Sequence, residues 1–395
     1  MSMHTSRKSL AILGSTGSVG CSTLDVVKLH PEKYKVVALS ACHNVYKMYE
    51  QCLEFNPALA VMADNDAALA LEARIKQSAC KTEVLAGHDS IVGLAKDDQI
   101  DSVMVAIVGG IGLEPSFAAV QAGKTVMIAN KEPLVMAGSF FMAEARKSGA
   151  NILPIDSEHN ALFQCLPFPF AKKDQIERLI LTASGGPFLG KKWQDLKAVS
   201  LEQAIAHPNW SMGPKISVDS ATMMNKGLEL IEATHLFEMP AKSIDILIHP
   251  QSVIHSMVEY IDGSHLAQLG TPDMRVPIAH ALSFPDRISS GVDKLDLTTL
   301  SSLEFQKPDW NETPCLRLAK EVAASDAVDA IKMNAANEIA VDAFINKRIS
   351  FTDIYTIIDK VVSQSFSGNT EMINDILQLD QKARDEASSV VELLS

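Results

Sequence analysis

The chain has 395 residues, of which 47% are hydrophobic and 21% charged, and its formal net charge is −13. This length predicts two or three domains with sizeable buried cores. The acidity argues against nucleic acids and anionic membranes as partners, because the field of the protein repels polyanions. Six irregularly spaced cysteines without a C-x-x-C pair argue against zinc. The apolar run Leu10–Leu13 is too short for a signal-peptide core, and no run approaches a membrane span, so we expect a cytoplasmic protein.

Residues 1–150 alternate short apolar runs with amphipathic stretches. Continuously apolar strands separated by helices are typical of a parallel sheet that is covered on both faces. We therefore predict a Rossmann-like, doubly wound α/β domain here. Its predicted strands are Ser9–Leu13, Lys35–Leu39, Ala58–Met62, Thr82–Leu85, Ser102–Val108, Thr125–Ala129 and Asn151–Ile155.

From about Asp156 the sequence pattern changes to longer loops with glycine and proline between the strands. For 151–285 we predict an α+β domain with a mixed sheet, in which Asp262-Gly263 turns a hairpin. Its predicted strands are Ile176–Thr182, Ile244–Ile248, Ile254–Tyr260 and His265–Leu269. Residues 286–314 are rich in turn formers and predict a connector, and 315–395 predict a C-terminal helical bundle. The predicted helices are Cys315–Ala324, Ala327–Asn346, Thr352–Ser363 and Gln381–Leu394.

A glycine-rich loop with the spacing G-x-x-G-x-x-G (Gly14, Gly17 and Gly20) follows the first predicted strand and opens a helix. In that place the loop indicates a nucleotide pyrophosphate at the helix N-terminus; the alternative is a plain glycine turn. NAD-binding folds usually carry an acid at the end of the second strand. Here Cys42-His43-Asn44 follow that strand without one, which favours NADP over NAD.

The segment Lys215–Glu229 contains more candidate polar and charged binding residues than any other segment of its length. We interpret Ile216 and Val218 as a short β run, followed by Asp219-Ser220 at the N-cap of a helix. A helix N-terminus that carries a hydroxyl group suits a phosphate.

The helix that follows presents three polar side chains at spacings of three and four residues: Asn225, Lys226 and Glu229. Residues at these spacings share one helix face. The amide and the ammonium suit a phosphate, and the carboxylate suits a metal ion.

Asp156 and Glu158 stand two residues apart after a predicted strand, and in extended geometry they point the same way. With Glu229 they provide three hard oxygen ligands, which select Mg²⁺ or Mn²⁺. The alternative is that they are solvated loop residues. The neighbouring His159 is interpreted as a hydrogen-bonded support rather than a ligand.

Two further loops are candidates for binding. Residues 182–187 contain Ser184 and two glycines after a strand, a pattern that suits a phosphate cradle. Residues 207–214 combine His207, Trp210 and Met212 with a glycine. That loop is either a surface patch packed on the protein or a mobile lid.

The chain resembles the 1-deoxy-D-xylulose 5-phosphate reductoisomerases in many segments that occur in the same order. These are GSTGSVGCSTLDVV from Gly14, AGKTVMIANKE to Glu132, PIDSEHNALFQ from Pro154, LTASGGPF from Leu181, HPNWSMG from His207, KISVDSATMMNKGLE from Lys215, IHPQSVIHSMV from Ile248, LAQLGTPDMR to Arg275 and NAANEIAV from Asn334. The resemblance implies an NADPH-dependent oxidoreductase of the non-mevalonate isoprenoid pathway, assembled as a homodimer. Its reaction isomerises and reduces a sugar phosphate, 1-deoxy-D-xylulose 5-phosphate, to 2-C-methyl-D-erythritol 4-phosphate.

The same resemblance assigns residues by motif position. Metal ligands would be Asp156, Glu158 and Glu229, and the catalytic residues would be Lys131, Glu158, His207 and Glu229. The substrate would be held by Lys131, Ser157, Glu158, Ser184, His207, Ser220, Asn225, Lys226 and Glu229, under a lid (204–214) that carries Trp210 and Met212. The cofactor site would contain Gly14, Thr16, Gly17, Ser18, Val19, Cys42, His43, Asn44, Asn130, Glu132 and Gly213.

The chain departs from the family pattern in three places. Cys42-His43-Asn44 stands where many members have Gly-Lys-Asn, Pro133 replaces a usual Ser, and Pro214 stands where a basic residue is frequent.

Two other functions remain open from the sequence. One is a semialdehyde dehydrogenase, which needs a nucleophilic cysteine; Cys165 lies in an apolar helical pattern that favours a core position. The other is a non-catalytic NADPH-sensing protein.

Overall fold

A computed structural model describes residues 7–166, 173–210 and 212–395. The chain divides into two compact units. The first comprises residues up to 130, 143–156 and 273–293, and the second comprises 131–142, 157–272 and 294–395. Each unit contains one β-sheet, and the four-part division predicted from the sequence stays a prediction.

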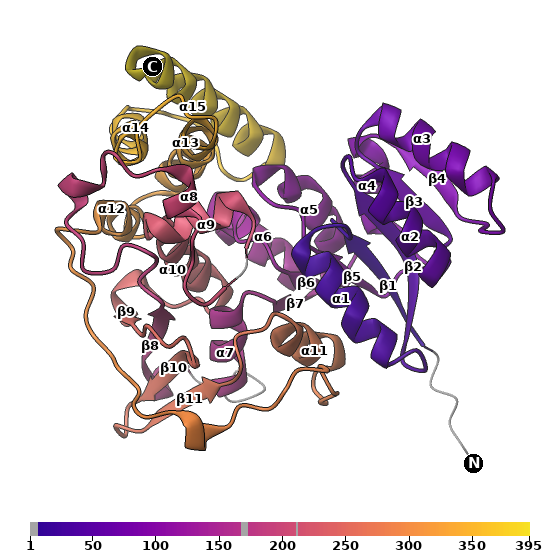
Figure 1. Cartoon of the computed structure of the whole chain (residues 1–395), viewed down its shortest axis with the longest axis horizontal. Helices are drawn as coiled ribbons and strands as arrows, with labels where there is room; N and C mark the ends of the chain where they lie inside the picture. Colours follow the sequence, from indigo (N-terminus) through magenta and orange to yellow (C-terminus); the bar gives the residue numbers. More distant parts are fainter. Residues whose placement is uncertain (1–6, 167–172, 211) are drawn as a thin grey trace. The chain divides into compact units, whose positions relative to one another are not determined.

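The first unit contains a seven-stranded parallel sheet in the order β4-β3-β2-β1-β5-β6-β7 (Figure 1). The strands are β1 (Lys8–Leu13), β2 (Tyr34–Ala41), β3 (Leu59–Met62), β4 (Glu83–Ala86), β5 (Ser102–Val105), β6 (Thr125–Ile128) and β7 (Asn151–Pro154). The helices are α1 (Ser18–Leu29), α2 (Val45–Phe55), α3 (Asn65–Lys76), α4 (His88–Lys96), α5 (Leu113–Gln121), α11 (Arg275–Ser283) and the end of α6 (Glu132–Ser148). All seven predicted strands are present, with ends shifted by up to three residues.

The strand order of this sheet reverses at β1, which has β2 on one side and β5 on the other. In open α/β sheets ligands bind at such a switch point, outside the carboxyl ends of the strands. The turn from β1 to α1 starts at Gly14, whose φ is 86°. A Cβ atom at Gly14 would lie 2.5 Å from the carbonyl oxygen of Ala106, so the turn admits only glycine.

The second unit contains a four-stranded mixed sheet in the order β11-β10-β8-β9. Its strands are β8 (Ile176–Ala183), β9 (Ile244–Ile248), β10 (Ile254–Tyr260) and β11 (His265–Leu269). β8 pairs with β9 in parallel and with β10 in antiparallel fashion, and β10 and β11 form the hairpin that Asp262-Gly263 predicted. The sheet predicted from the sequence is therefore confirmed.

The second unit also contains helices. They are α7 (Ser157–Cys165), α8 (Leu201–Ala204), α9 (Pro214–Ala221), α10 (Met224–Leu236), α12 (Pro314–Val322), α13 (Ala327–Ile345), α14 (Asp353–Val362), α15 (Ile373–Leu394) and the start of α6. The long helix α13 packs against α14 and α15, and a buried cluster around Met333, Phe344 and Phe351 joins these helices to α9 and α10. α15 begins eight residues earlier than predicted, because Ile376 and Leu379 extend its buried face.

The β run predicted at Ile216 and Val218 is wrong, and so is the N-cap predicted at Asp219-Ser220. Residues 214–221 form α9, which begins with Pro214 directly after Gly213. Proline suits the first helical position because its missing N–H group has no helical partner there. A second helix, α10, starts after Met223, whose left-handed φ of 62° separates the two. Among the described residues, no helix is long and apolar enough to cross a bilayer.

His280 on α11 gives the first unit a testable pH dependence. The residue is 8% exposed, and burial, followed by repulsion from Arg287, lowers the pKa of His280 to about 4. Folding therefore favours the neutral ring. The resulting stability is fully present above the ordinary pKa of about 6.5 and is lost as the pH falls from there towards 4. We expect this loss to be about 2 kcal/mol at pH 4.5.

Urea unfolding at pH 7 and pH 4.5 measures this effect. His280→Gln removes the titrating group, so the variant should lose less unfolding free energy between the two pH values than the wild type does. Equal losses in the two proteins would contradict the assignment.

Candidate functional site

The second unit brings together two acidic side chains, Glu158 and Glu229. Glu158 lies in the first turn of α7 and its side chain is 20% exposed, whereas Glu229 lies inside α10 and is 1% exposed. Carboxylate oxygens of the two residues lie within 4.8 Å of each other. Two carboxylates so close in a buried place need positive charge between them.

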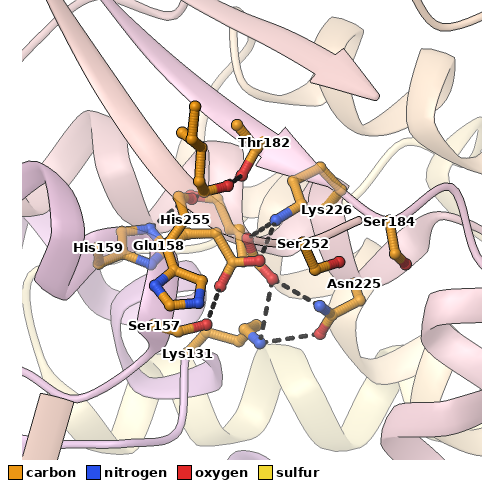
Figure 2. Close-up of polar contacts among 12 residues, drawn as sticks. Lys131, Ser157, Glu158, His159, Thr182, Ser184, Asn225, Lys226, Ser252 and His255 are labelled. Carbon is orange, nitrogen blue, oxygen red and sulfur yellow. Dashed lines mark hydrogen bonds and ion pairs between the residues drawn. The ribbon is translucent and has the colours of Figure 1, made fainter. Parts of the chain in front are cut away.

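Two lysines supply this charge (Figure 2). Lys226 Nζ donates to Glu158 Oε1 at 2.8 Å and also to Glu229 Oε2. Lys131 Nζ lies 3.7 Å from Glu229 Oε1 and donates to Asn225 Oδ1 at 2.8 Å. The amide group of Asn225 in turn donates to Glu229 Oε1 at 2.5 Å. Two carboxylates, two ammonium groups and an amide thus form one cluster.

Both local and distant features of the sequence build this cluster. Asn225, Lys226 and Glu229 share one face of α10, as their spacing predicted. Ser157 Oγ donates to Glu158 Oε2 at 2.5 Å, which orients that carboxylate. The contacts to Glu158 and Lys131 join residues that are 68 and 94 positions apart in the chain.

The electrostatics of the cluster keep Lys226 charged. Burial by itself would lower the pKa of Lys226, but the carboxylates of Glu158 and Glu229 overcome this effect and raise it above its ordinary value. The ammonium of Lys226 therefore persists throughout the physiological pH range.

Ser184 and His207 form a second polar pair in this unit. Ser184 Oγ lies 2.9 Å from His207 Nε2. His207 Nδ1 accepts the backbone N–H groups of Asn209 and Trp210 at 3.2 and 3.0 Å, so the ring proton resides on Nε2 and points at the hydroxyl oxygen. Burial lowers the pKa of His207, which keeps the ring neutral at neutral pH.

The loop that carries Ser184 lies against the end of α9. Gly185 and Gly186 have φ values of 88° and 69°, and a Cβ atom at Gly186 would lie 2.6 Å from the carbonyl oxygen of Ser220. The loop that carries Ser184 therefore lies beside the end of α9, which carries Ser220.

The segment with Trp210 packs on the body of the second unit. Asn209 Nδ2 donates to the carbonyl oxygen of Pro250 at 2.7 Å and to Ser252 Oγ at 2.9 Å. The rings of Trp210 and His255 have centroids 6.3 Å apart. Of the two alternatives predicted for residues 207–214, these contacts agree with a surface patch packed on the protein. Motion of the loop as a lid stays a prediction. Met212 is half-buried and Gly213 exposed, whereas Ser211 lies outside the described residues.

Sequence reasoning assigned no role to His255 or Ser252, which Figure 2 shows beside the cluster. His255 is 5% exposed, its Nδ1 lies 2.7 Å from Gln268 Oε1, and its Nε2 has no hydrogen-bond partner among the described residues. His255 lies beside the cluster because of the pairing of β10 with β11, which is not a local feature of the sequence. The strand pattern showed that β10 exists, but not which face of it meets α7.

Asp156 is the last residue of 143–156 in the first unit, directly before Ser157. The extended backbone predicted from Asp156 to Glu158 is wrong, because Ser157 begins α7 and Glu158 is helical. His159 makes the hydrogen bond expected of a support. Its Nε2 donates to the backbone carbonyl of Glu229 at 2.9 Å, and its Nδ1 lies 3.5 Å from Glu232 Oε2.

Most predicted cofactor residues lie in the first unit, at the carboxyl ends of β1 and β2 and after β6. They are Gly14, Thr16, Gly17, Ser18, Val19, Cys42, His43, Asn44 and Asn130. Asn44 caps α2 through a bond from Lys47 N, and His43 is exposed, with Nδ1 3.7 Å from Asp64 Oδ2. Glu132 and Gly213 belong to the second unit, where Glu132 is buried and accepts a bond from Lys215.

The fold and the cluster together define a class of protein. Its first unit has the doubly wound fold that is typical of nucleotide binding. Its second unit carries buried carboxylates and ammonium groups that suit a hard cation and an anionic ligand. Comparison with known proteins narrows this class. Three family models match, described as 1-deoxy-D-xylulose 5-phosphate reductoisomerase (residues 10–138), its C-terminal domain (152–237) and DXP reductoisomerase C-terminal domain (269–386).

Relatives match over nearly the whole chain. The 1-deoxy-D-xylulose 5-phosphate reductoisomerase of Paraburkholderia xenovorans is 53% identical over 388 residues, which cover 98% of this chain and 97% of the relative. That of Burkholderia multivorans is 51% identical over 385 residues, with 98% and 97% covered.

Solved structures agree with these relatives. A crystal structure of DOX-P reductoisomerase in complex with NADPH, fosmidomycin and magnesium matches with a TM-score of 0.95 and 46% identity, covering 98% of this chain and 99% of that one. The enzyme from Zymomonas mobilis in complex with NADPH has a TM-score of 0.90 and 44% identity, with 98% and 100% covered. This chain belongs to the 1-deoxy-D-xylulose 5-phosphate reductoisomerase family.

Proposed function

We propose that the protein converts 1-deoxy-D-xylulose 5-phosphate to 2-C-methyl-D-erythritol 4-phosphate, with NADPH as reductant and Mg²⁺ or Mn²⁺ as a required cation. The observation that carries this proposal is the buried cluster in which Glu158 and Glu229 meet Lys131 and Lys226. In such a cluster, carboxylates that suit a cation lie within a few ångströms of ammonium groups that suit an anion.

The donor set fits a hard divalent cation. Glu158 and Glu229 offer carboxylate oxygens within 4.8 Å of each other, and such oxygens are the ligands that Mg²⁺ and Mn²⁺ prefer. We assign Asp156, the residue directly before the N-terminus of α7, as the third ligand. When bound, the cation supplies Lewis acidity to the ketone and the neighbouring hydroxyl group of the substrate.

The charge balance of the cluster explains why cation and substrate should bind together. The two carboxylates and the two ammonium groups have no net charge, and the proposed third ligand, Asp156, would add one negative charge. A divalent cation would then leave the site with one net positive charge, which attracts a phosphate dianion. Each ligand thus lowers the electrostatic cost of binding the other.

The remaining residues hold and orient the substrate. Ser184, Ser220, Asn225 and Lys226 offer donors to the phosphate. His207 holds the substrate through Ser184, whose hydroxyl oxygen accepts the Nε2 proton of the neutral ring. Lys131 and Ser157, which contact Asn225 and Glu158, are placed to bind the substrate hydroxyl groups. Trp210 and Met212 exclude water by covering the carbon chain.

The first unit would bind NADPH at the glycine turn, and the cofactor supplies a hydride. Within this proposal the second unit is the catalytic domain, and the C-terminal helices α12–α15 support it. Cys42 and His43 would stand near the 2′-phosphate, and Asn130, Glu132 and Gly213 are the other residues proposed to contact the cofactor.

A direct assay tests the proposal. The absorbance of NADPH is followed after addition of 1-deoxy-D-xylulose 5-phosphate, with and without Mn²⁺, to protein freed of metal by chelation. We expect oxidation only when both cation and substrate are present. NADPH binding that is indifferent to cations, without turnover, would instead support the NADPH-sensing alternative.

The semialdehyde dehydrogenase alternative finds no support at Cys165. The residue lies in α7, is 8% exposed, and burial raises the pKa of its thiol to about 11. A nucleophilic cysteine needs a lowered pKa and access to substrate.

We also propose a homodimer. β11 is an edge strand whose Leu266 and Leu269 are 50% and 37% exposed, and such an edge is a template for pairing with another chain. Sedimentation velocity on the wild type and on Leu266→Asp would test it: a dimer that the variant weakens is expected, and a monomeric wild type would refute it.

A further inference from the structure

A chain of buried polar contacts crosses the second unit from α13 to the start of α6. Asn337 Nδ2 donates to Asp219 Oδ1 at 2.8 Å. The other oxygen of Asp219, Oδ2, lies 2.9 Å from Lys215 Nζ, which also donates to Glu132 Oε1 at 2.7 Å. Asn337, Asp219 and Glu132 are all at most 4% exposed.

Stability alone is a poor explanation for this chain of contacts. Buried ion pairs are often no more stabilising than apolar side chains of similar volume, because desolvation offsets their attraction. What they do impose is a defined geometry. Lys215 and Asp219 are four residues apart on α9, and two carboxylates share one ammonium group, so each oxygen must occupy a particular place.

The series of contacts ends at Glu132, which is next in sequence to Lys131 of the cluster. Glu132 is the first residue of α6, and the carbonyl of Lys131 accepts the N–H groups of Leu134 and Val135 at 3.1 and 3.0 Å, as at a helix N-cap. Holding the side chain of Glu132 therefore fixes the first turn of α6. That turn sets the direction in which Lys131 leaves the backbone towards Asn225 and Glu229.

We propose that Asp219 and Asn337 are positioning residues for Lys131: by holding Lys215 against Glu132, they set the place of the Lys131 ammonium in the cluster. The proposal rests on the role in substrate binding proposed above for Lys131. Because Asn337 acts through Lys131, the C-terminal helix α13 contributes to the reaction without touching substrate.

The first test compares two buried asparagines on α13. Asn337→Leu removes the donor to Asp219. Asn334→Leu is the matched control, because Asn334 is equally buried, three residues away on the same helix, and donates to Glu338 instead. We expect kcat/KM to fall by about 10- to 100-fold in Asn337→Leu and by less than about threefold in Asn334→Leu, with similar changes in Tm. Equal losses of kcat/KM would overturn the proposal.

A double-mutant cycle asks whether the effect passes through Lys131. In a Lys131→Met background, Asn337→Leu should reduce kcat/KM by less than about twofold, because the side chain that it positions is gone. A merely structural role would produce the same fold loss in both backgrounds. Such additivity would refute positioning of Lys131.

A third measurement does not depend on the reaction. The resting protein is labelled with an amine-reactive ester, and acylation of Lys131 is followed by mass spectrometry, with Lys226 of the same cluster as the internal reference. Asn337→Leu should raise labelling of Lys131 several-fold relative to Lys226, and Asn334→Leu should leave the ratio unchanged. An unchanged ratio in Asn337→Leu would overturn the positioning role even if the proposed reaction proved wrong.

Discussion

Replacing Glu229 with glutamine is expected to reduce kcat by about 10²- to 10³-fold or more, while NADPH binding is retained. The side chain is 1% exposed and central to the cluster, where it accepts from Lys226 and Asn225. Glutamine keeps its shape but removes the charge, and a neutral amide oxygen is a far weaker ligand for a hard divalent cation. The variant should fold, because Lys226 keeps its bond to Glu158.

Mn²⁺ titrations of kcat, NADPH fluorescence and thermal unfolding together measure this result. Glu259→Gln is the control: it makes the same change to a carboxylate of the second unit that pairs with Arg178 outside the cluster, and should alter kcat by less than about twofold. Near-normal turnover in Glu229→Gln would remove Glu229 from the metal site.

Replacing Lys226 with methionine is expected to move two affinities in opposite directions. The ammonium lies between Glu158 and Glu229, so its removal makes the cation site more negative and should tighten Mn²⁺ binding by about 10-fold or more. The phosphate meanwhile loses a charge-assisted hydrogen bond worth about 1.5–3 kcal/mol, which should raise the KM for substrate by about 10- to 100-fold.

Calorimetric Mn²⁺ titration without substrate and steady-state kinetics, both at about pH 8, separate these two effects. Lys242→Met serves as the control, since it removes the same charge from an exposed position. Weaker Mn²⁺ binding by Lys226→Met would contradict the electrostatic description of the cluster.

The parts of this structure that depend on local pattern were predicted well from the sequence. Continuous apolar runs located every strand of both sheets, and the spacing of Asn225, Lys226 and Glu229 placed them on one helix face. The error at Ile216 and Val218 arose because alternating apolar residues also occur in a short amphipathic helix. Pro214 and the Lys215–Asp219 spacing were the signals for that helix.

Contacts between distant segments could not be predicted from pattern. No local signal shows that Asn337 meets Asp219, 118 residues away, or that His255 lies beside Trp210. The left-handed turn at Met223 was also missed, because methionine has no preference for that conformation. The resemblance to a family supplied candidate roles for Ser184 and His207, and the structure brings these two side chains together.

The wide separation of the cluster residues along the chain has a consequence for folding. Lys131 and Asn225 are 94 positions apart, and Asn337, which follows both, bonds to Asp219. Non-local contacts form slowly, because a large loop must close before the contact stabilises it. During synthesis, the carboxylates of Glu158 and Glu229 therefore emerge as ordinary solvated side chains with little affinity for a cation. Because α13 carries Asn337, we expect Lys131 to reach its place in the cluster only after this helix has left the ribosome and docked.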